Sequence, residues 1–174
     1  MKEKLLTGLT LFLIAAVSGL LLDQVNSLTQ PVIIEAQAER INNAYLALFP
    51  TFDRFDSLNI TDAAPIVDGA QVFDAQGNVL GYVYQVSALN DHGSIGLLIG
   101  VDSNGVVVDY VELDFNQTPG ISAPARKTNY GFTFVSQPIM RDYQAVDVSI
   151  GATRSASTLR DLFEAVSVYH GGRV

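Results

Sequence analysis

The chain of 174 residues contains no cysteine and no tryptophan. The absence of cysteine excludes disulfide bonds, thiolate-ligated iron–sulfur clusters and the covalent attachment of c-type haem. Basic residues are also few, 10 against 18 acidic ones, and the formal net charge is -8. Nucleic-acid binding needs a basic patch, so this charge balance disfavours nucleic acid as a partner. Any redox cofactor would have to be held by groups other than thiols, and the composition itself does not point to one.

Charge is missing altogether from residues 5–22, which follow Lys2 and Lys4 and end at Asp23. At a helical rise of about 1.5 Å per residue, this run spans roughly 27 Å, close to the hydrocarbon thickness of a bilayer. The run is too long for the apolar core of a cleavable signal peptide, so we expect a retained single-pass transmembrane anchor in residues 1–23. By the positive-inside rule, the two lysines place the N-terminus in the cytoplasm and the rest of the chain outside the cytoplasmic (inner) membrane.

The remaining chain is expected to form a connecting helix, residues 24–50 with a bend near Pro31, and one domain, residues 51–174. Residues 50–68 are predicted to be loop. Strands are predicted at residues 71–75, 78–87, 94–101, 106–115, 132–135 and 143–148, and a helix at residues 155–170. The turn residues of two hairpins, at 76–77 and 102–105, predict an α+β fold with a mostly antiparallel sheet packed by helices.

The stretch before the closing helix combines small side chains with hydroxyl groups. Gly151 and Ala152 permit a sharp turn, Thr153 offers a hydroxyl, and Ser155 or Ser157 can cap the helix that follows. The free N–H groups and the dipole of a helix start favour an anion such as phosphate. By pattern alone, an ordinary strand–turn–helix junction is the simpler interpretation, and a phosphate-binding site is the alternative.

Residues 147–155, Asp-Val-Ser-Ile-Gly-Ala-Thr-Arg-Ser, resemble the Asp-x-x-Ser/Thr-Gly-Ala-Thr-x-Ser/Thr motif of FMN-binding domains. These domains occur in the G subunit of the Rnf complex and in the C subunit of the sodium-translocating NADH:quinone oxidoreductase. The residues that match are Asp147, Gly151, Ala152, Thr153 and Ser155. Ile150 stands where the family usually has Ser or Thr. The resemblance assigns this whole segment to the cofactor site and implies that Thr153 carries FMN through a phosphoester bond, installed by a separate flavin transferase.

A second loop carries the same resemblance. Pro119 and Gly120 suit the two central positions of a type II turn. The loop is similar to the family's Glu-Thr-Pro-Gly-Leu-Gly segment, which packs beside the bound flavin, and it matches at Thr118, Pro119 and Gly120. Gln117 and Ser122 replace the usual Glu and Gly. Two partial motifs in the family's order are more specific than either motif alone.

Three further polar side chains could act near such a site. Arg126 and Lys127 form the only adjacent basic pair in the sequence and could neutralise a phosphate or a reduced flavin. His92 lies in a loop and could relay a proton. A surface position without a ligand is the alternative for all three.

The resemblance covers the chain from the anchor to the final helix. It implies a membrane-anchored flavoprotein subunit of an ion-translocating electron-transport complex of the Rnf or Nqr type. Electrons would pass through FMN on Thr153 to integral membrane and redox subunits, and no independent substrate catalysis and no metal site are expected. The alternatives are a stand-alone extracytoplasmic FMN carrier and a non-redox anchored sensor or structural domain.

Overall fold

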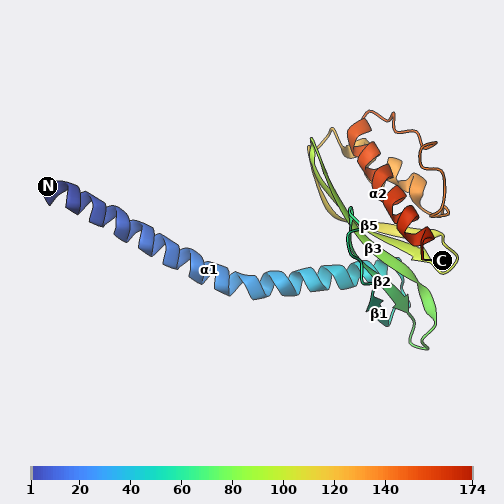
Figure 1. Ribbon diagram of the computed structural model, residues 1–174, viewed down its shortest axis with the longest axis horizontal. Coiled ribbons are helices and arrows are strands. Elements are labelled where there is room, and N and C mark those ends of the chain that lie inside the picture. The colour runs from blue at the N-terminus through green and yellow to red at the C-terminus, as the bar shows by residue number, and fades with distance from the viewer. Residues whose placement is uncertain (1, 174) are drawn as a thin grey trace. The chain divides into compact units, whose positions relative to one another are not determined.

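The computed structural model describes residues 2–173, except for the side chains of residues 2–6, 33, 34 and 37. The described chain contains a long helix, five strands, two short 3-10 helices and a C-terminal helix (Figure 1). It divides into two compact units, with the boundary between Asn43 and Ala44. The expected three-part division at residues 23 and 50 stays a prediction.

Helix α1 runs from Lys2 to Leu48 and continues through Pro31 without interruption. Its segment Thr7–Val32 has a mean hydropathy of 1.8, is 26 residues long, and is not buried by any other part of the described chain. A helix that is apolar on all sides has no favourable environment in water unless another element covers it. By length and composition, this segment can cross a membrane.

The second unit is built on one antiparallel sheet. Its strands are β1 (Arg54–Ser57), β2 (Ile66–Phe73), β3 (Val79–Asn90), β4 (Gly93–Asp102) and β5 (Val107–Gln117). They pair in sequence order, and each neighbouring pair is antiparallel. The predicted α+β fold with an antiparallel sheet is therefore confirmed.

Both faces of the sheet are covered. One face packs against α2 (Thr153–Gly171) and η2 (Tyr130–Phe134), and Figure 1 shows α2 in red against the strands. The short helix η1 (Ala123–Ala125) contacts α2 and η2. The other face packs against buried residues 44, 45, 48 and 49. Adjacent residues of β4 therefore enter opposite cores, Leu97 on one side and Leu98 on the other. This explains why residues 95–101 are all buried without polar alternation.

One predicted loop is a strand. Residues 54–57, expected to be part of a loop, form the edge strand β1, paired with β2. All four side chains of β1 are exposed, so the segment carries no hydrophobic alternation that could have indicated a strand. The segment is a strand because its backbone forms hydrogen bonds with the edge of β2.

Two predicted strands are absent from the described chain. Residues 132–135 belong mostly to the 3-10 helix η2, residues 143–146 form bends and turns, and residues 147 and 148 have no regular structure. In both segments the apolar residues serve packing: the ring of Phe134 stacks on Phe163 at 4.5 Å, and Val146 packs against the same core. Tyr143 donates its hydroxyl to the carbonyl of Ile139, 2.9 Å away, which holds a compact turn in place of an extended strand.

Candidate functional site

Helix α2 begins at Thr153, one residue after its N-cap Ala152, and no side chain caps it. The prediction that Ser155 or Ser157 caps this helix is wrong. Ser155 lies inside the first turn and is 1% exposed, and its hydroxyl donates to Oε1 of Gln117 instead. Since the first N–H groups of a helix have no partner within the helix, the start of α2 keeps free donors beside Thr153.

Gly151 makes the turn into the helix possible. Its φ of +82° lies in the left-handed region, which glycine adopts without steric cost. The two residues that follow in this turn differ in exposure, because Ala152 is buried and the side chain of Thr153 is exposed. The backbone therefore presents the hydroxyl of Thr153 at the surface while it anchors the preceding methyl group in the core.

A cleft of about 240 Å³ lies beside Thr153. It is lined by His92, Ile121, Gly151, Ala152, Thr153, Arg154 and Ser155. The β3–β4 turn, the loop after β5 and the start of α2 thus meet at one place. Among the described residues that line this cleft, none is acidic.

The other predicted site residues are not among the residues that line the cleft. Thr118, Pro119 and Gly120 are exposed and directly precede Ile121, which lines the cleft. Gly120 has a φ of +84°, as its predicted position in a type II turn requires. The side chain of Ile150 packs against the core.

Asp147 has a local structural role. Its side chain is exposed, and Oδ1 accepts a hydrogen bond of 2.8 Å from the backbone N–H of Ser149. This bond shapes the chain four residues before the turn at Gly151. Asp147 therefore supports the path of the backbone toward the cleft without lining the cleft itself.

A buried polar network fastens the start of α2 to the end of the sheet. Nε2 of Gln117 donates to Oδ1 of Asn90 at 2.8 Å and to the carbonyl of Gly93 at 3.1 Å, while Oε1 accepts from Ser155. Nδ2 of Asn90 donates to the hydroxyl of Thr158 at 2.9 Å. The network satisfies the amide of Gln117, which is only 7% exposed.

Sequence reasoning did not identify Asn90 and Thr158 as part of this arrangement. They lie 68 positions apart in the chain, and no local pattern connects them. Gln117 carried the one available signal, because it occupies a motif position with an unusual residue type. Its amide supplies both the donors and the acceptor that the network uses.

The basic pair lies apart from the cleft lining and is neutralised by strand β5. Nη2 of Arg126 lies 2.6 Å from Oε2 of Glu112, and Nζ of Lys127 lies 2.7 Å from Oδ2 of Asp109. Both residues are therefore surface residues in ion pairs, which is the alternative to a role in neutralising a phosphate or a reduced flavin. Arg154, which sequence reasoning overlooked, is the cation in the described cleft lining.

Arg154 and His92 complete the polar lining. Nη2 of Arg154 lies 3.6 Å from Oδ2 of Asp91, and both side chains are more than 70% exposed, at 72% and 76%. Such a pair is weak, so the guanidinium of Arg154 is free to reorient toward an anion. His92 is half-buried, and its backbone N–H donates to Oδ1 of Asn90 at 2.9 Å.

These observations define a class of protein: an antiparallel α+β domain that follows a long apolar helix and presents a threonine hydroxyl beside an uncapped helix start. The chain is 26% identical over 170 residues to the G subunit of the ion-translocating oxidoreductase complex of Methanosarcina acetivorans, with 92% of this chain and 90% of the relative covered. It is 24% identical over 172 residues to the G subunit of the proton-translocating ferredoxin:NAD(+) oxidoreductase complex of Clostridium ljungdahlii, covering 90% of this chain and 88% of the relative. No family model matches the chain.

The relatives confirm the predicted resemblance to the G subunit of Rnf-type complexes. The similarity includes about nine-tenths of both chains and is therefore not limited to the two short motifs. Together with the unburied apolar segment Thr7–Val32, it supports a single-pass membrane protein.

Proposed function

We propose that this chain is the G-type subunit of a membrane-bound, ion-translocating electron-transport complex and that it carries FMN on Thr153 through a phosphoester bond. The observation that carries the proposal is the placement of the Thr153 hydroxyl, which is exposed at the first residue of α2 and lines a cleft. A tethered cofactor needs an accessible attachment atom with space beside it, and this hydroxyl has both. The two relatives, each named as the G subunit of a translocating oxidoreductase complex, support the assignment to such a complex.

The residues around Thr153 fit a phosphate ester. The uncapped start of α2 supplies N–H donors and the positive end of the helix dipole. Arg154 adds a cation to the cleft lining. The isoalloxazine of a bound flavin supplies the electron transfer, and the protein supplies its position and the surrounding charge.

The attachment itself is a phosphoryl transfer made by a flavin transferase. The Thr153 oxygen forms a bond to the FMN phosphorus of FAD, the bond from that phosphorus to the AMP oxygen breaks, AMP leaves, and a base accepts the hydroxyl proton. An exposed hydroxyl lets a second protein reach this atom. The exposed loop of residues 118–120, next to Ile121, provides a neighbouring surface for the ring.

The membrane placement follows from the same proposal. With Lys2 and Lys4 on the cytoplasmic side, the second unit lies on the extracytoplasmic side. A covalent bond keeps a cofactor that could otherwise be lost to the medium there. Residues 5–22 of the anchor carry no charge, so the ion path belongs to partner subunits.

Covalent labelling tests the cofactor assignment. The chain is co-expressed with a flavin transferase, and the denatured protein is examined for flavin fluorescence on a gel and for a mass increase of one FMN less water. Thr153→Ala should abolish both signals, and Thr153→Ser should retain them because it keeps a hydroxyl. Thr128→Ala is the matched control, since Thr128 is also exposed but lies outside the cleft lining. A wild-type chain that stays dark, or a fluorescent Thr153→Ala variant, contradicts the assignment.

Purification from native membranes tests the assignment to a complex. A subunit of a complex should co-purify in mild detergent with integral membrane redox subunits. A stand-alone FMN carrier would be labelled on Thr153 but would purify without them. A non-redox anchored domain would show neither property.

A further inference from the structure

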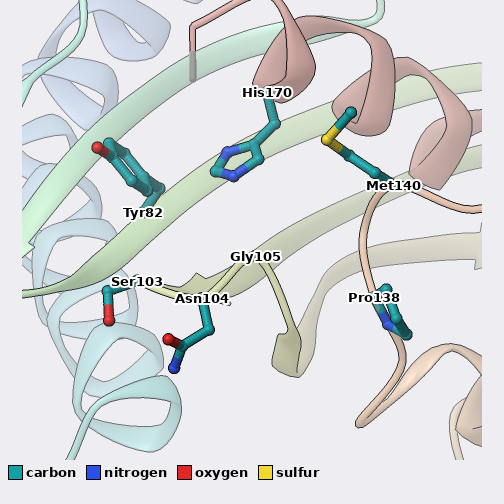
Figure 2. Close-up of a pocket in the computed structure, with 7 residues that line it drawn as sticks. All are labelled: Tyr82, Ser103, Asn104, Gly105, Pro138, Met140 and His170. Atoms are coloured by element: carbon teal, nitrogen blue, oxygen red, sulfur yellow. The ribbon is translucent and has the colours of Figure 1, made fainter.

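A second cavity lies near the C-terminal end of α2 and has no lining residue in common with the Thr153 cleft. Its volume is about 280 Å³, and it is lined by Tyr82, Ser103, Asn104, Gly105, Pro138, Met140 and His170 (Figure 2). These residues come from β3, from the β4–β5 turn, from the segment after η2 and from α2. None of these seven lining residues carries a full charge at neutral pH when His170 is neutral.

His170 provides a directed hydrogen-bond donor in this cavity. Its side chain is buried, with the residue 4% exposed, and Nδ1 lies 2.8 Å from the hydroxyl oxygen of Tyr84. Tyr84 is fully buried, and Nδ1 is the one hydrogen-bond partner that its hydroxyl has among the described residues. A buried hydroxyl proton needs an acceptor, so Tyr84 donates to Nδ1, and the imidazole proton resides on Nε2.

The Nε2–H group has no acceptor among residues 2–173 and faces the cavity. Figure 2 shows the imidazole projecting from the helix into the space between Tyr82 and Gly105. A Cβ atom added at Gly105 would lie 4.0 Å from Nε2, so any longer side chain at this position would compete for that space. A φ of +77° also favours glycine there. Nε2 is accessible from the cavity, so it can donate a hydrogen bond to a ligand that enters there.

The surroundings keep the imidazole uncharged. Burial lowers the pKa of His170, and the nearby Arg173 cation lowers it further. The other titratable groups packed against the ring are the phenols of Tyr82, 5.3 Å away between ring centroids, and Tyr84. With a neutral imidazole and no carboxylate in the described lining, the cavity offers no net charge to attract an ion.

The walls favour a flat, apolar body. Tyr82 presents an aromatic ring, Pro138 a pyrrolidine ring, and Met140 a polarizable thioether that adapts to irregular shapes. Ser103 and Asn104 are polar residues of the β4–β5 turn and add polar atoms at the rim. One fixed donor that faces the cavity, apolar walls and a polar rim are the usual composition of a small-molecule site.

We propose that this cavity binds a small, uncharged ring compound whose carbonyl oxygen accepts the hydrogen bond from Nε2–H of His170. The ring of the ligand lies against Tyr82, Pro138 and Met140. The site is independent of the attachment of FMN, because the two sites share no residue and lie at opposite ends of α2.

Histidine NMR on the full-length chain in detergent micelles tests this assignment. The sequence contains two histidines, and His92 in the other cleft is the internal control. The free protein should show His170 as the neutral Nε2–H tautomer. Benzamide, a neutral carbonyl compound, should shift the Nε2 signal of His170 in a saturable way and leave His92 unchanged. Toluene, which lacks the acceptor, and benzoate, which is charged, should bind about tenfold more weakly.

Two variants separate the cavity from the donor. Ser103→Trp fills the rim from a turn position, leaves the Tyr84–His170 pair intact, and should abolish benzamide binding. The double variant Tyr84→Phe/His170→Phe removes both partners together while keeping ring-shaped side chains, and should reduce benzamide affinity about tenfold, to the level of toluene. His92→Gln should bind benzamide like the wild type.

Several results would overturn the proposal. An Nδ1–H tautomer in the free protein would reverse the assigned donor. Benzamide that leaves His170 unchanged, or that shifts His92 equally, would mean that the cavity does not select it. Undiminished affinity in the Phe/Phe double variant would remove the role of Nε2.

Discussion

The two ends of α2 differ in how the hydrogen-bonding groups of their polar side chains are paired. At the start of the helix, the side chains of Ser155, Gln117 and Asn90 are joined by hydrogen bonds, and the side chains of Thr153 and Arg154 are exposed. Near the end of the helix, Tyr84 satisfies one nitrogen of His170 and leaves the other to face a cavity. The first arrangement suits covalent attachment at an exposed atom, since a rigid base presents it. The second suits reversible binding, since it holds an unused donor in an apolar site.

The largest loss of stability is expected from a substitution in the core that packs under the middle of α2, because both ends of the helix depend on that core. Phe163 is fully buried in the middle of α2, stacks on Phe134 at 4.5 Å and meets the ring of Tyr110 at 5.4 Å. Phe163→Ala should lower the free energy of unfolding by about 3–5 kcal/mol and weaken both sites together. Urea denaturation measures the loss, with exposed Val168→Ala as the control, expected to change stability by less than about 0.5 kcal/mol. A small loss in Phe163→Ala would mean that this core is not shared.

A smaller change should affect the start of the helix alone. Gln117→Leu leaves the hydroxyl of Ser155 without its acceptor and the carbonyl of Gly93 without its donor. We expect a loss of about 1–3 kcal/mol in unfolding free energy and slower flavin labelling of Thr153, with benzamide binding at His170 unchanged. Gln144→Leu is the matched control, because Gln144 bonds to Glu164 only at the surface. Equal effects of the two substitutions would contradict a role for the buried network.

The end of the helix should respond to pH. The pKa of His170 is lowered in the folded state, so the unfolded chain binds a proton more readily. The stabilisation from the neutral, buried imidazole is therefore complete above the ordinary histidine pKa of about 6.5 and declines as the pH falls through the lowered folded value. Thermal denaturation between neutral and mildly acidic pH should show a steeper acid loss in the wild type than in the Tyr84→Phe/His170→Phe variant. Parallel curves would rule out this group as the source.

The smallest effect on stability is expected at Arg154. Its pair with Asp91 is 3.6 Å long and exposed, so Arg154→Ala should change the unfolding free energy by less than about 0.5 kcal/mol. Labelling of Thr153 should nevertheless slow by about two- to fivefold, because a cation near the incoming phosphate is lost. Arg160→Ala, on the same helix but outside the cleft lining, should label at the wild-type rate. Equal rates for both variants would remove Arg154 from the site.

Local pattern was sufficient for much of the fold. The apolar helix, both hairpin turns and most of α2 were predictable, because hydrophobic periodicity and turn residues act over a few positions. The edge strand β1 was not, since its exposed side chains depend on a neighbour for pairing. Residues 132–135 and 143–148 were mistaken for strands, because their apolar side chains pack on α2 and its surroundings without extended backbone pairing.

For the two sites as well, features within a short stretch of sequence were predictable and contacts between distant residues were not. The turn at Gly151, the helix start near Thr153 and the turn at Gly120 were predictable from two contiguous motifs, while the cofactor role of these residues stays a prediction. Asn90, Arg154 and the two partners at the helix end gave no comparable signal. Tyr84 and His170 are 86 positions apart, and only the packing of α2 on β3 joins them.

By itself, the sequence determined an apolar anchor, an antiparallel domain and one threonine at a helix start, because each depends on residues close together in the chain. Only the tertiary structure decided that Ser155 is a buried support, that Arg126 and Lys127 are neutralised by β5, and that His170 faces a cavity. Those outcomes depend on which groups from distant parts of the chain come together in the folded structure, and no local pattern in the sequence names those partners.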